Sequence, residues 1–196
     1  MIRFDNVCKT YPKQLGSEAH EALKQVSFNL SKGETLGLVG PNGAGKSTSI
    51  RLLLDFIRPD KGSITLLGEK PDSPEIHRRI GYLPEVASFP QNLTCMDMMR
   101  FAGKTCQMSS SSISDATELW LKRLNLWHAK DRLLSNFSKG MQQRASFAMA
   151  LIHDPELFIL DEPMSGLDPI GRADIVQLIQ ELKHKGKSIL FCSHLL

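Results

Sequence analysis

The chain has 196 residues, of which 41% are hydrophobic and 23% are charged, a composition that is ordinary for a globular domain. Its 24 Lys and Arg residues against 21 Asp and Glu residues give a net charge of only +3, which excludes a strongly polybasic nucleic-acid binder. No apolar run reaches about 18 residues, so the sequence predicts no transmembrane helix. The N-terminus lacks a basic region followed by an apolar stretch, so no secretory signal is predicted either. The four cysteines form no C-x-x-C pair, which favours free thiols in a reducing compartment.

The first third of the chain predicts short strands joined by turns. Four apolar runs, punctuated by glycines, indicate strands at residues 2–4, 26–30, 36–39 and 64–67. Apolar residues at helical spacing predict a helix over residues 46–56, which stops before a proline.

The middle of the chain, about residues 94–134, predicts a helical insert. Thr94 followed by Asp97 indicates a helix start close to a capping box. A polar link at residues 109–112 precedes a second predicted helix, which we expect to begin at Ser114 or Asp115. A third helix is predicted after Ser138.

The last third alternates strands and helices. The apolar run 157–160 predicts a parallel strand that is buried on both faces. Leucines and isoleucines at i, i+3, i+4 and i+7 from residue 175 predict an amphipathic helix, and residues 188–192 predict a second buried strand. A strand, a helix and a strand in this order imply a right-handed crossover in a parallel sheet, so the fold class is α/β.

A glycine-rich loop follows the third predicted strand and precedes the first helix, as G-x-x-x-x-G-K-[ST] phosphate loops do. Glycine lets the backbone curl so that its N–H groups and the helix N-terminus form an anion site. In such a loop the lysine reaches the β- and γ-phosphates and the serine hydroxyl ligates Mg²⁺. The alternative, a plain glycine-rich turn, does not explain the flanking strand and helix. The predicted nucleotide-binding residues are Gly40, Pro41, Asn42, Gly43, Ala44, Gly45, Lys46, Ser47 and Thr48.

Two carboxylates follow the buried strand 157–160. Ligands of open α/β sheets bind beyond the carboxyl ends of the strands, so Asp161 is expected where Mg²⁺ would lie. Glu162 could orient or deprotonate an attacking water. A solvated acidic turn is the alternative, and the upstream phosphate loop argues against it.

Three further motifs surround these two. Residues 137–144 read Phe-Ser-Lys-Gly-Met-Gln-Gln-Arg, residues 165–168 read Ser-Gly-Leu-Asp, and Ser193 and His194 follow the last strand. Over essentially the whole chain, this order of motifs resembles the ATP-binding subunit of ABC transporters. The resemblance implies a P-loop NTPase with a mainly parallel sheet core, a small N-terminal antiparallel β part and a helical insert. It implies one ABC ATPase domain over residues 1–196, with the core at 1–84 and 145–196 and the helical subdomain at 85–144.

The resemblance also implies roles for single residues. Ser138 and Gly140 belong to the signature motif, which closes over the γ-phosphate of ATP held by the other subunit, although Ser138 could be a plain helix cap. Asp168 anchors the loop that links the two sites, or simply ends a turn. His194 is similar to the switch histidine that contacts the γ-phosphate, or is structural. Tyr11 stands where the family stacks an aromatic ring on adenine, and its alternative is partial burial.

Two positions depart from the common family pattern. The signature usually reads Leu-Ser-Gly-Gly-Gln, whereas residues 137–141 read Phe-Ser-Lys-Gly-Met. Glu85 stands where the family usually has glutamine, and its carboxylate can still contact Mg²⁺ or a water of that ion. Both variations are similar to the exporter branch that includes drug, sodium and polysaccharide export ATPases.

The implied function is ATP binding and hydrolysis that powers a separate membrane permease, on the export side. The expected partners are that permease and a second ATP-binding subunit, identical or different, arranged head to tail; no nucleic acid is expected. The chain would lie at the cytoplasmic side of the membrane, held through the permease. The Glu85 loop and Met96, Met98 and Met99 are expected to grip the permease, or else to fill the core.

The alternative function is a soluble ABC-type ATPase that acts on nucleic acid or ribosomes. About 90 residues separate Lys46 from Ser138, without the heptads of a long coiled coil, which argues against it. Because family members usually continue past the switch histidine, the end at residue 196 also predicts a truncated C-terminus, with strand 188–192 poorly covered.

Overall fold

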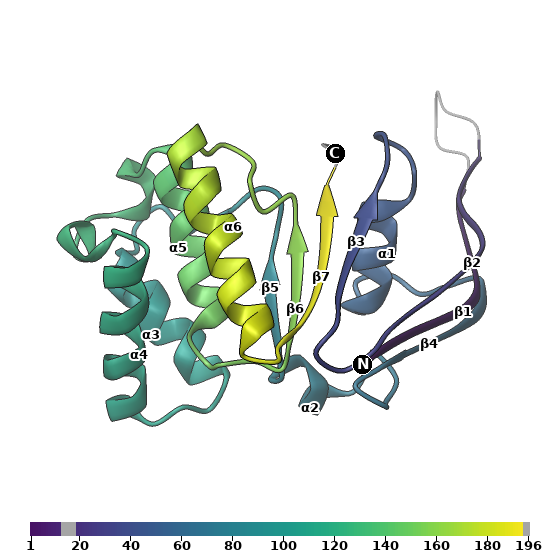
Figure 1. Ribbon diagram of the computed structural model, residues 1–196, viewed down its shortest axis with the longest axis horizontal. Helices are drawn as coiled ribbons and strands as arrows, with labels where there is room; N and C mark the ends of the chain where they lie inside the picture. The colour runs from purple at the N-terminus through teal and green to yellow at the C-terminus, as the bar shows by residue number, and fades with distance from the viewer. Residues whose placement is uncertain (13–18, 194–196) are drawn as a thin grey trace.

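The computed structural model describes residues 1–12 and 19–193. An antiparallel sheet, a parallel sheet and a group of helices lie next to one another along the longest axis of the molecule (Figure 1).

The antiparallel sheet has the order β2-β1-β4 and consists of β1 (Ile2–Tyr11), β2 (His20–Leu30) and β4 (Lys61–Leu66). Ile2, Phe4 and Val7 of β1 are buried. Strand β1 continues to Tyr11, further than its apolar run predicts, and its register with β2 shifts three times between Phe4 and Thr10. As a result, Tyr11 at the end of β1 is paired with His20 at the start of β2.

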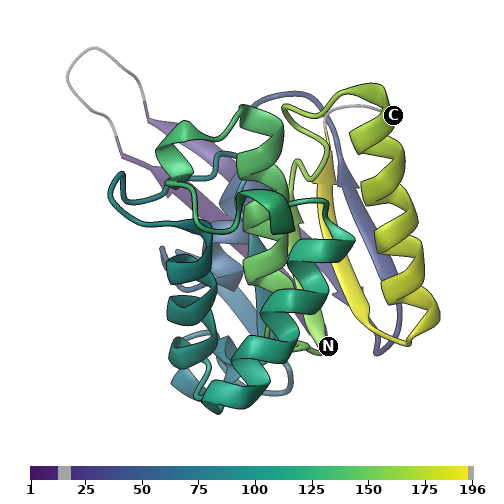
Figure 2. The same ribbon diagram turned by 90° about the vertical axis from the view of Figure 1, so that its left-hand side faces the viewer.

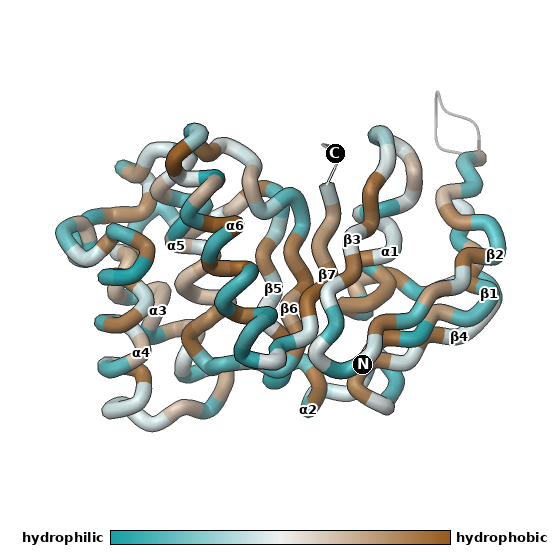
Figure 3. Tube along the Cα trace, in the orientation of Figure 1, coloured by the Kyte–Doolittle hydropathy of each residue, from teal (hydrophilic) through white to brown (hydrophobic). Residues whose placement is uncertain are grey.

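The parallel sheet has the order β3-β7-β6-β5 and consists of β3 (Thr35–Val39), β7 (Ser188–Ser193), β6 (Leu157–Asp161) and β5 (Ile80–Leu83). All three pairings are parallel, so the carboxyl ends of the four strands lie at one edge. Every residue of β6 is buried, as the predicted apolar run requires, and its tube is largely brown in Figure 3. Helix α6 (Pro169–His184) connects β6 to β7.

The expectation that strand 188–192 is poorly covered is wrong. Strand β7 lies between β3 and β6, where its backbone is paired on both sides. Ile189, Leu190 and Cys192 are completely buried. An edge of this sheet is instead formed by β3, whose Val39 is 46% exposed.

The helices are α1 (Lys46–Leu53), α2 (Pro74–His77), α3 (Cys95–Thr105), α4 (Ser110–Arg123) and α5 (Lys139–Leu151), with short 3₁₀ helices at Trp127–Ala129 and Leu134–Asn136. Helices α3, α4 and α5 pack against one another around a core that includes Met99, Leu121 and Phe147. Met99 is fully buried, so the expectation that it grips a permease is wrong; Met96 and Met98 are half-buried. None of the helices in the described ranges has the length and apolar content needed to span a bilayer.

The first residues of the helices show which local sequence signals predict a helix start correctly. The capping box of α3 is present: Thr94 Oγ1 accepts from the N–H of Asp97, and the Asp97 carboxylate accepts from the N–H of Thr94. Helix α4 begins at Ser110 rather than at Ser114 or Asp115, because Ser109 Oγ accepts from the N–H of Ser112 at 3.1 Å. Helix α1 ends at residue 53, three residues earlier than predicted. All four cysteines are free, as predicted.

Candidate functional site

The predicted phosphate loop leaves the carboxyl end of β3 and leads into α1 (Figure 1). Gly43 and Gly45 have φ angles of 86° and 87°, a left-handed backbone conformation that residues other than glycine rarely adopt. A Cβ atom at Gly45 would lie 2.5 Å from Leu23 Cδ2 and 2.6 Å from the carbonyl oxygen of Ala22. The loop is therefore pressed against β2, and only glycine fits at position 45.

The N-terminus of α1 is arranged to receive an anion. Its cap residue is Gly45, so no side chain caps the first turn. N–H groups at such a helix start are left for a ligand, and the helix dipole favours negative charge there. The Lys46 ammonium donates to the carbonyl oxygens of Gly40 and Pro41, which keeps its charge beside the loop. The Ala44 N–H donates to the carbonyl oxygen of Pro41 and closes the turn.

A pocket of about 390 Å³ opens over this loop, within the usual size range of small-molecule sites. Tyr11 Oη lies 3.4 Å from Thr48 Oγ1, which fixes the tyrosine near the first turn of α1. The pocket brings together predicted residues from three segments. It is lined by Tyr11, His20, Ala22, Asn42, Gly43, Gly45, Lys46, Ser47, Thr48 and Glu85.

Two of these lining residues, His20 and Ala22, were not predicted from the sequence. His20 reaches the pocket because it is paired with Tyr11 across β1 and β2. The register of that strand pair is the signal that would have found it, and register shifts in β1 hide this signal in the sequence.

The two predicted carboxylates lie at the carboxyl end of β6. Asp161 is the last residue of the strand and is 6% exposed, and Glu162 follows it at 9%. Glu162 has a φ angle of 48°, which a non-glycine residue rarely adopts, and its N–H donates to the carbonyl oxygen of Cys192 at 3.2 Å. The neighbouring strand β7 thus holds Glu162 in a conformation that stores backbone strain, as functional residues often do.

Negative charge is concentrated at this edge of the sheet. Burial, together with the charges of Glu85 and Glu162, raises the pKa of Asp161 to about 6, while Lys46 and Arg51 oppose this rise. These electrostatic interactions indicate that Asp161 lies near both Glu85 and the lysine of the phosphate loop. A cation at this position would relieve the repulsion between the carboxylates.

The residues present fit Mg²⁺ held jointly with a phosphate group. In the described residues, no group of three or more His, Cys, Asp or Glu side chains could hold a metal ion by itself. Mg²⁺ usually needs no such cage, because one or two protein oxygens, substrate phosphates and waters complete its shell. The Ser47 hydroxyl and the Asp161 carboxylate are oxygen donors of the required kind.

The residues of the signature segment lie elsewhere. Ser138 caps α5, since its Oγ accepts from the N–H of Met141 at 3.3 Å. A Cβ at Gly140 would lie 3.5 Å from the carbonyl oxygen of Gly166, so the start of α5 packs against the loop at 165–168. Asp168 caps α6 by accepting from the N–H of Gly171. Neither Ser138, Gly140 nor Asp168 lines the phosphate-loop pocket, and His194 lies outside the described residues.

Comparison with known proteins supports this reading of the motifs. Two curated relatives align over nearly the whole chain. The uncharacterized ABC transporter ATP-binding protein YxlF of Bacillus subtilis (strain 168) is 38% identical over 197 residues, which are 100% of this chain and 63% of the relative. The fluoroquinolones export ATP-binding protein MT2762 of Mycobacterium tuberculosis (strain CDC 1551 / Oshkosh) is 36% identical over 196 residues, 99% of this chain and 62% of that protein. The chain thus spans less than two thirds of either relative.

Among solved structures, a dimeric post-hydrolysis state of the ATP-binding cassette MJ0796 bound to ADP and Pi superposes with a TM-score of 0.88. Its sequence is 27% identical, and the match covers 99% of this chain and 88% of that one. Residues 23–165 match the family described as ABC transporter, and this range is more than half of the chain. From these matches, and from the phosphate loop and carboxylates placed at one sheet edge, the chain belongs to the ABC transporter family.

Proposed function

We propose that the chain binds and hydrolyses ATP with Mg²⁺ as one half of a head-to-tail pair, and that this pair powers a separate membrane permease. One observation carries the proposal. Tyr11, the phosphate loop and Glu85 line one pocket, whereas Ser138 and Gly140, which belong to the same family motif set, lie outside it. One chain therefore provides most of a nucleotide site together with a separate surface suited to complete a second one.

The phosphate loop would bind the substrate through its backbone and one cation. The first N–H groups of α1 would donate to the phosphate oxygens, and the Lys46 ammonium would exchange its two loop carbonyls for the β- and γ-phosphates. The Tyr11 ring would stack on the base, a contact that tolerates any base. His20, across the strand pair, would border the same part of the nucleotide.

The carboxylates would carry out the chemical step. Ser47 and Asp161 would hold Mg²⁺, which would neutralise charge on the phosphoryl oxygens, and Glu85 would contact that ion or one of its waters. Glu162 would orient the attacking water and accept its proton, and its strained backbone would keep the carboxylate in place. His194, which follows β7, would contact the γ-phosphate.

A second copy would close the site. The hydroxyl of Ser138 and the backbone of Gly140 at the start of α5 would bind the γ-phosphate held by the partner copy. The loop at 165–168 contacts the start of α5 and ends at Asp168, so it would link the two nucleotide sites. The dimeric structure of MJ0796 supports such a pair.

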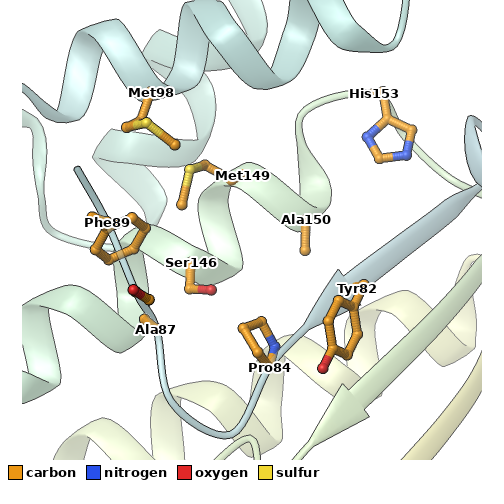
Figure 4. A pocket seen from close by; sticks show the side chains of 10 residues that line it. Tyr82, Pro84, Ala87, Phe89, Met98, Ser146, Met149, Ala150 and His153 are labelled. Atoms are coloured by element: carbon orange, nitrogen blue, oxygen red, sulfur yellow. The ribbon is translucent and has the colours of Figure 1, made fainter. Parts of the chain in front are cut away.

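The permease surface would lie at a second pocket of about 250 Å³, between the loop that follows β5 and helices α3 and α5 (Figure 4). Met98 of α3, Met149 of α5 and Phe89 of the loop lie together at one end of this pocket. Val86 in the same loop and Phe101, three residues after Met98 on α3, are exposed apolar residues. Because Glu85 belongs to this loop and lines the nucleotide pocket, the loop would connect permease contact to nucleotide state.

The comparisons support a proposed direction and location of transport. The relative MT2762 is an export ATP-binding protein, which supports export by the complex to which this chain would belong. The chain would then work at the cytoplasmic side of the membrane, held there through the permease.

The catalytic assignment is tested with the full chain and Mg²⁺–ATP. Replacing the carboxylate that would orient the attacking water, Glu162→Gln, should lower phosphate release by about 100-fold or more, since general-base catalysis contributes at least that much. ATP binding should be retained, and the dimer should accumulate because the closed pair no longer turns over. These are measured by phosphate release, equilibrium dialysis with ATP and light scattering.

Glu156→Gln is the matched control. Glu156 lies at the amino end of the same strand, where it forms an ion pair with Arg79 at 2.8 Å. That exposed pair contributes at most about 1 kcal/mol to stability, so hydrolysis should stay within about twofold of wild type. Equal rates for Glu162→Gln and wild type would remove Glu162 from the mechanism.

The permease surface is tested by placing a charge in it. In cells that hold the cognate permease, Met98→Glu should move most of the chain from the membrane fraction to the soluble fraction, while hydrolysis by the purified protein changes less than about twofold. Leu119→Glu is the control, since Leu119 is 59% exposed on α4 and does not line this pocket. Equal release by the two variants would contradict the assignment of this surface.

A further inference from the structure

We propose that the groove between α3 and α4 is a second ligand site, which binds a phosphate group attached to a small organic body. This site goes beyond the proposed function. The nucleotide pocket and the permease pocket share no lining residue with it.

The groove exists because α3 and α4 approach closely at one point. A Cβ at Gly103 would lie 2.5 Å from Ile113 Cγ1, so only glycine allows this contact. Beside it, a pocket of about 350 Å³ runs between the two helices, which lie side by side in both views (Figures 1 and 2). It is lined by Met96, Arg100, Lys104, Ser110, Ile113, Ser114 and Thr117.

The charged side chains of this pocket are cations. Arg100 and Lys104 lie one turn apart on α3, and no carboxylate lines the pocket. Arg100 has one ion pair, to Asp97 at 3.8 Å, which leaves most of its donors available, and Lys104 has no ion pair among residues 1–12 and 19–193. On the opposite wall, Ser110 begins α4, a helix of 14 residues without an acidic residue in its first turn. The dipole of that helix favours an anion near Ser110, and the C-terminal end of α3 at Thr105 partly opposes it.

The buried hydroxyl of Thr117 has no hydrogen-bond partner in the described part of the chain. Thr117 lines the pocket and is 1% exposed. Leaving a buried hydroxyl unpaired costs about 1–3 kcal/mol, so a hydroxyl in this position points to an acceptor supplied by a ligand. Because Thr117 Oγ1 is itself buried, a rotation of this side chain toward the pocket would let it donate to an oxygen of a phosphate group whose charge lies between Arg100 and Lys104.

The apolar residues that line the groove indicate the chemistry of the rest of the ligand. Met96 and Ile113 form apolar walls, which suit a short carbon body rather than a bare ion. Met96 and Met98 are two residues apart on α3 and so point to different sides of the helix, which separates this groove from the proposed permease surface. The ligand class is thus a phosphate monoester, either free in solution or as the headgroup of a lipid.

The test follows methyl groups by NMR in the full chain. Glycerol 3-phosphate and inorganic phosphate are titrated separately, and the methyl signals of Met96 and Ile113 report the groove. Ile50, buried in α1 behind the phosphate loop, reports binding at the nucleotide site. We expect Met96 and Ile113 to shift with a saturable dependence, at lower concentration for glycerol 3-phosphate than for inorganic phosphate. Shifts of Ile50 without shifts of Met96 and Ile113 would overturn the proposal.

Three variants separate a ligand role from helix packing. Thr117→Val keeps the shape and removes the hydroxyl, and it should weaken glycerol 3-phosphate binding about tenfold. Lys104→Ala should weaken it by a similar factor. Lys122→Ala is the matched control, because Lys122 lies on α4, pairs with Glu118 and does not line the groove. An affinity that is unchanged in Thr117→Val and Lys104→Ala would overturn the site.

Binding to vesicles distinguishes a lipid headgroup from a soluble phosphate ester. Sedimentation of the chain with phosphatidylcholine vesicles that contain phosphatidic acid, abolished by Lys104→Ala and not by Lys122→Ala, would assign the site to a lipid headgroup. Saturable binding of glycerol 3-phosphate with no vesicle binding would assign it to a soluble phosphate ester. The absence of both kinds of binding would contradict the proposal.

Discussion

Helices α1 and α5 both begin at a motif of the nucleotide machinery, yet their first turns are capped in opposite ways. Helix α1 starts at Gly45, which has no side chain to occupy the first N–H groups. Helix α5 starts at Ser138, whose hydroxyl accepts from the N–H of Met141 within the same chain. The first turn of α1 is therefore open to a ligand, while the first turn of α5 already satisfies one of its own donors.

The packing around the first turns of α1 and α5 also differs. Gly45 is pressed against Ala22 and Leu23 of β2, which fixes the phosphate loop before any nucleotide binds. Gly140 faces the loop at 165–168 and lies away from the pocket of its own chain. The difference indicates that one half of the site is built within the chain, and that the other half becomes useful on pairing with a second copy.

The largest effect should come from breaking the contact that fixes the phosphate loop. In Gly45→Ala, a left-handed backbone and a Cβ at 2.5 Å from Leu23 Cδ2 act together, and we expect a loss of about 4 kcal/mol in the free energy of unfolding. Urea unfolding followed by circular dichroism measures it. ATP affinity of the folded fraction should fall at least about tenfold, because the loop must move.

Gly43→Ala measures the cost of the left-handed backbone alone, without a steric contact. Gly43 has nearly the same φ angle, 86°, but a Cβ there has no atom within 4 Å. We expect this variant to lose only about 1 kcal/mol. Equal losses for the two variants would mean that the contact with β2 does not fix the loop.

A prebuilt site should also reduce the stability of the empty chain. Burial raises the pKa of Asp161 to about 6, so the folded chain favours the protonated carboxyl. Stability from this group is present at low pH and is lost as pH rises through about 6, by up to about 3 kcal/mol. Asp161→Asn should therefore unfold at a higher temperature than wild type at pH 7.5, and at nearly the same temperature at pH 4, as measured by scanning calorimetry without nucleotide.

Asp174→Asn is the control for a general effect of charge. Asp174 is exposed on α6, and its replacement should leave the unfolding temperature within about 1 °C at both pH values. If Asp161→Asn also leaves the unfolding temperature unchanged at pH 7.5, neither burial nor the neighbouring carboxylates disfavour the charged form of Asp161.

The phosphate loop and the carboxylates were predictable because their chemistry is local. Glycines at fixed spacing before a lysine and a serine determine the backbone shape of the loop, and Asp161 and Glu162 follow a run that can only be a buried strand. The antiparallel register that places His20 opposite Tyr11 was not predictable, because irregular pairing in β1 decides it.

The errors have a similar origin. The start of α4 depends on a hydrogen bond from the N–H of Ser112 to Ser109, in a serine run that has no apolar periodicity. The coverage of β7 depends on its place between β3 and β6, which strand order decides and local sequence does not contain. Met99 is buried because α4 and α5 pack on α3, a tertiary effect that a methionine count does not show.

The last test of the comparison between α1 and α5 removes the cap of α5, and its expected effect on stability is small. Ser138→Ala removes one capping hydrogen bond and should lower the free energy of unfolding by about 1 kcal/mol. Hydrolysis should fall about tenfold or more, because the hydroxyl would also be lost from the nucleotide of the partner copy. Both quantities are measured on the same preparation, the first by urea unfolding and the second by phosphate release.

Ser109→Ala separates capping from catalysis. Ser109 caps α4 through the same kind of hydrogen bond, to the N–H of Ser112 at 3.1 Å, but it belongs to no nucleotide motif. The two variants should lose similar stability, since each removes one serine cap, and only Ser138→Ala should lose hydrolysis. If both lose hydrolysis equally, the rate follows the stability of the helices, and Ser138 acts only within its own chain. If only Ser138→Ala does, its hydroxyl acts on the nucleotide of the partner copy, because the oxygen can accept from the N–H of Met141 while its O–H donates to a phosphate oxygen.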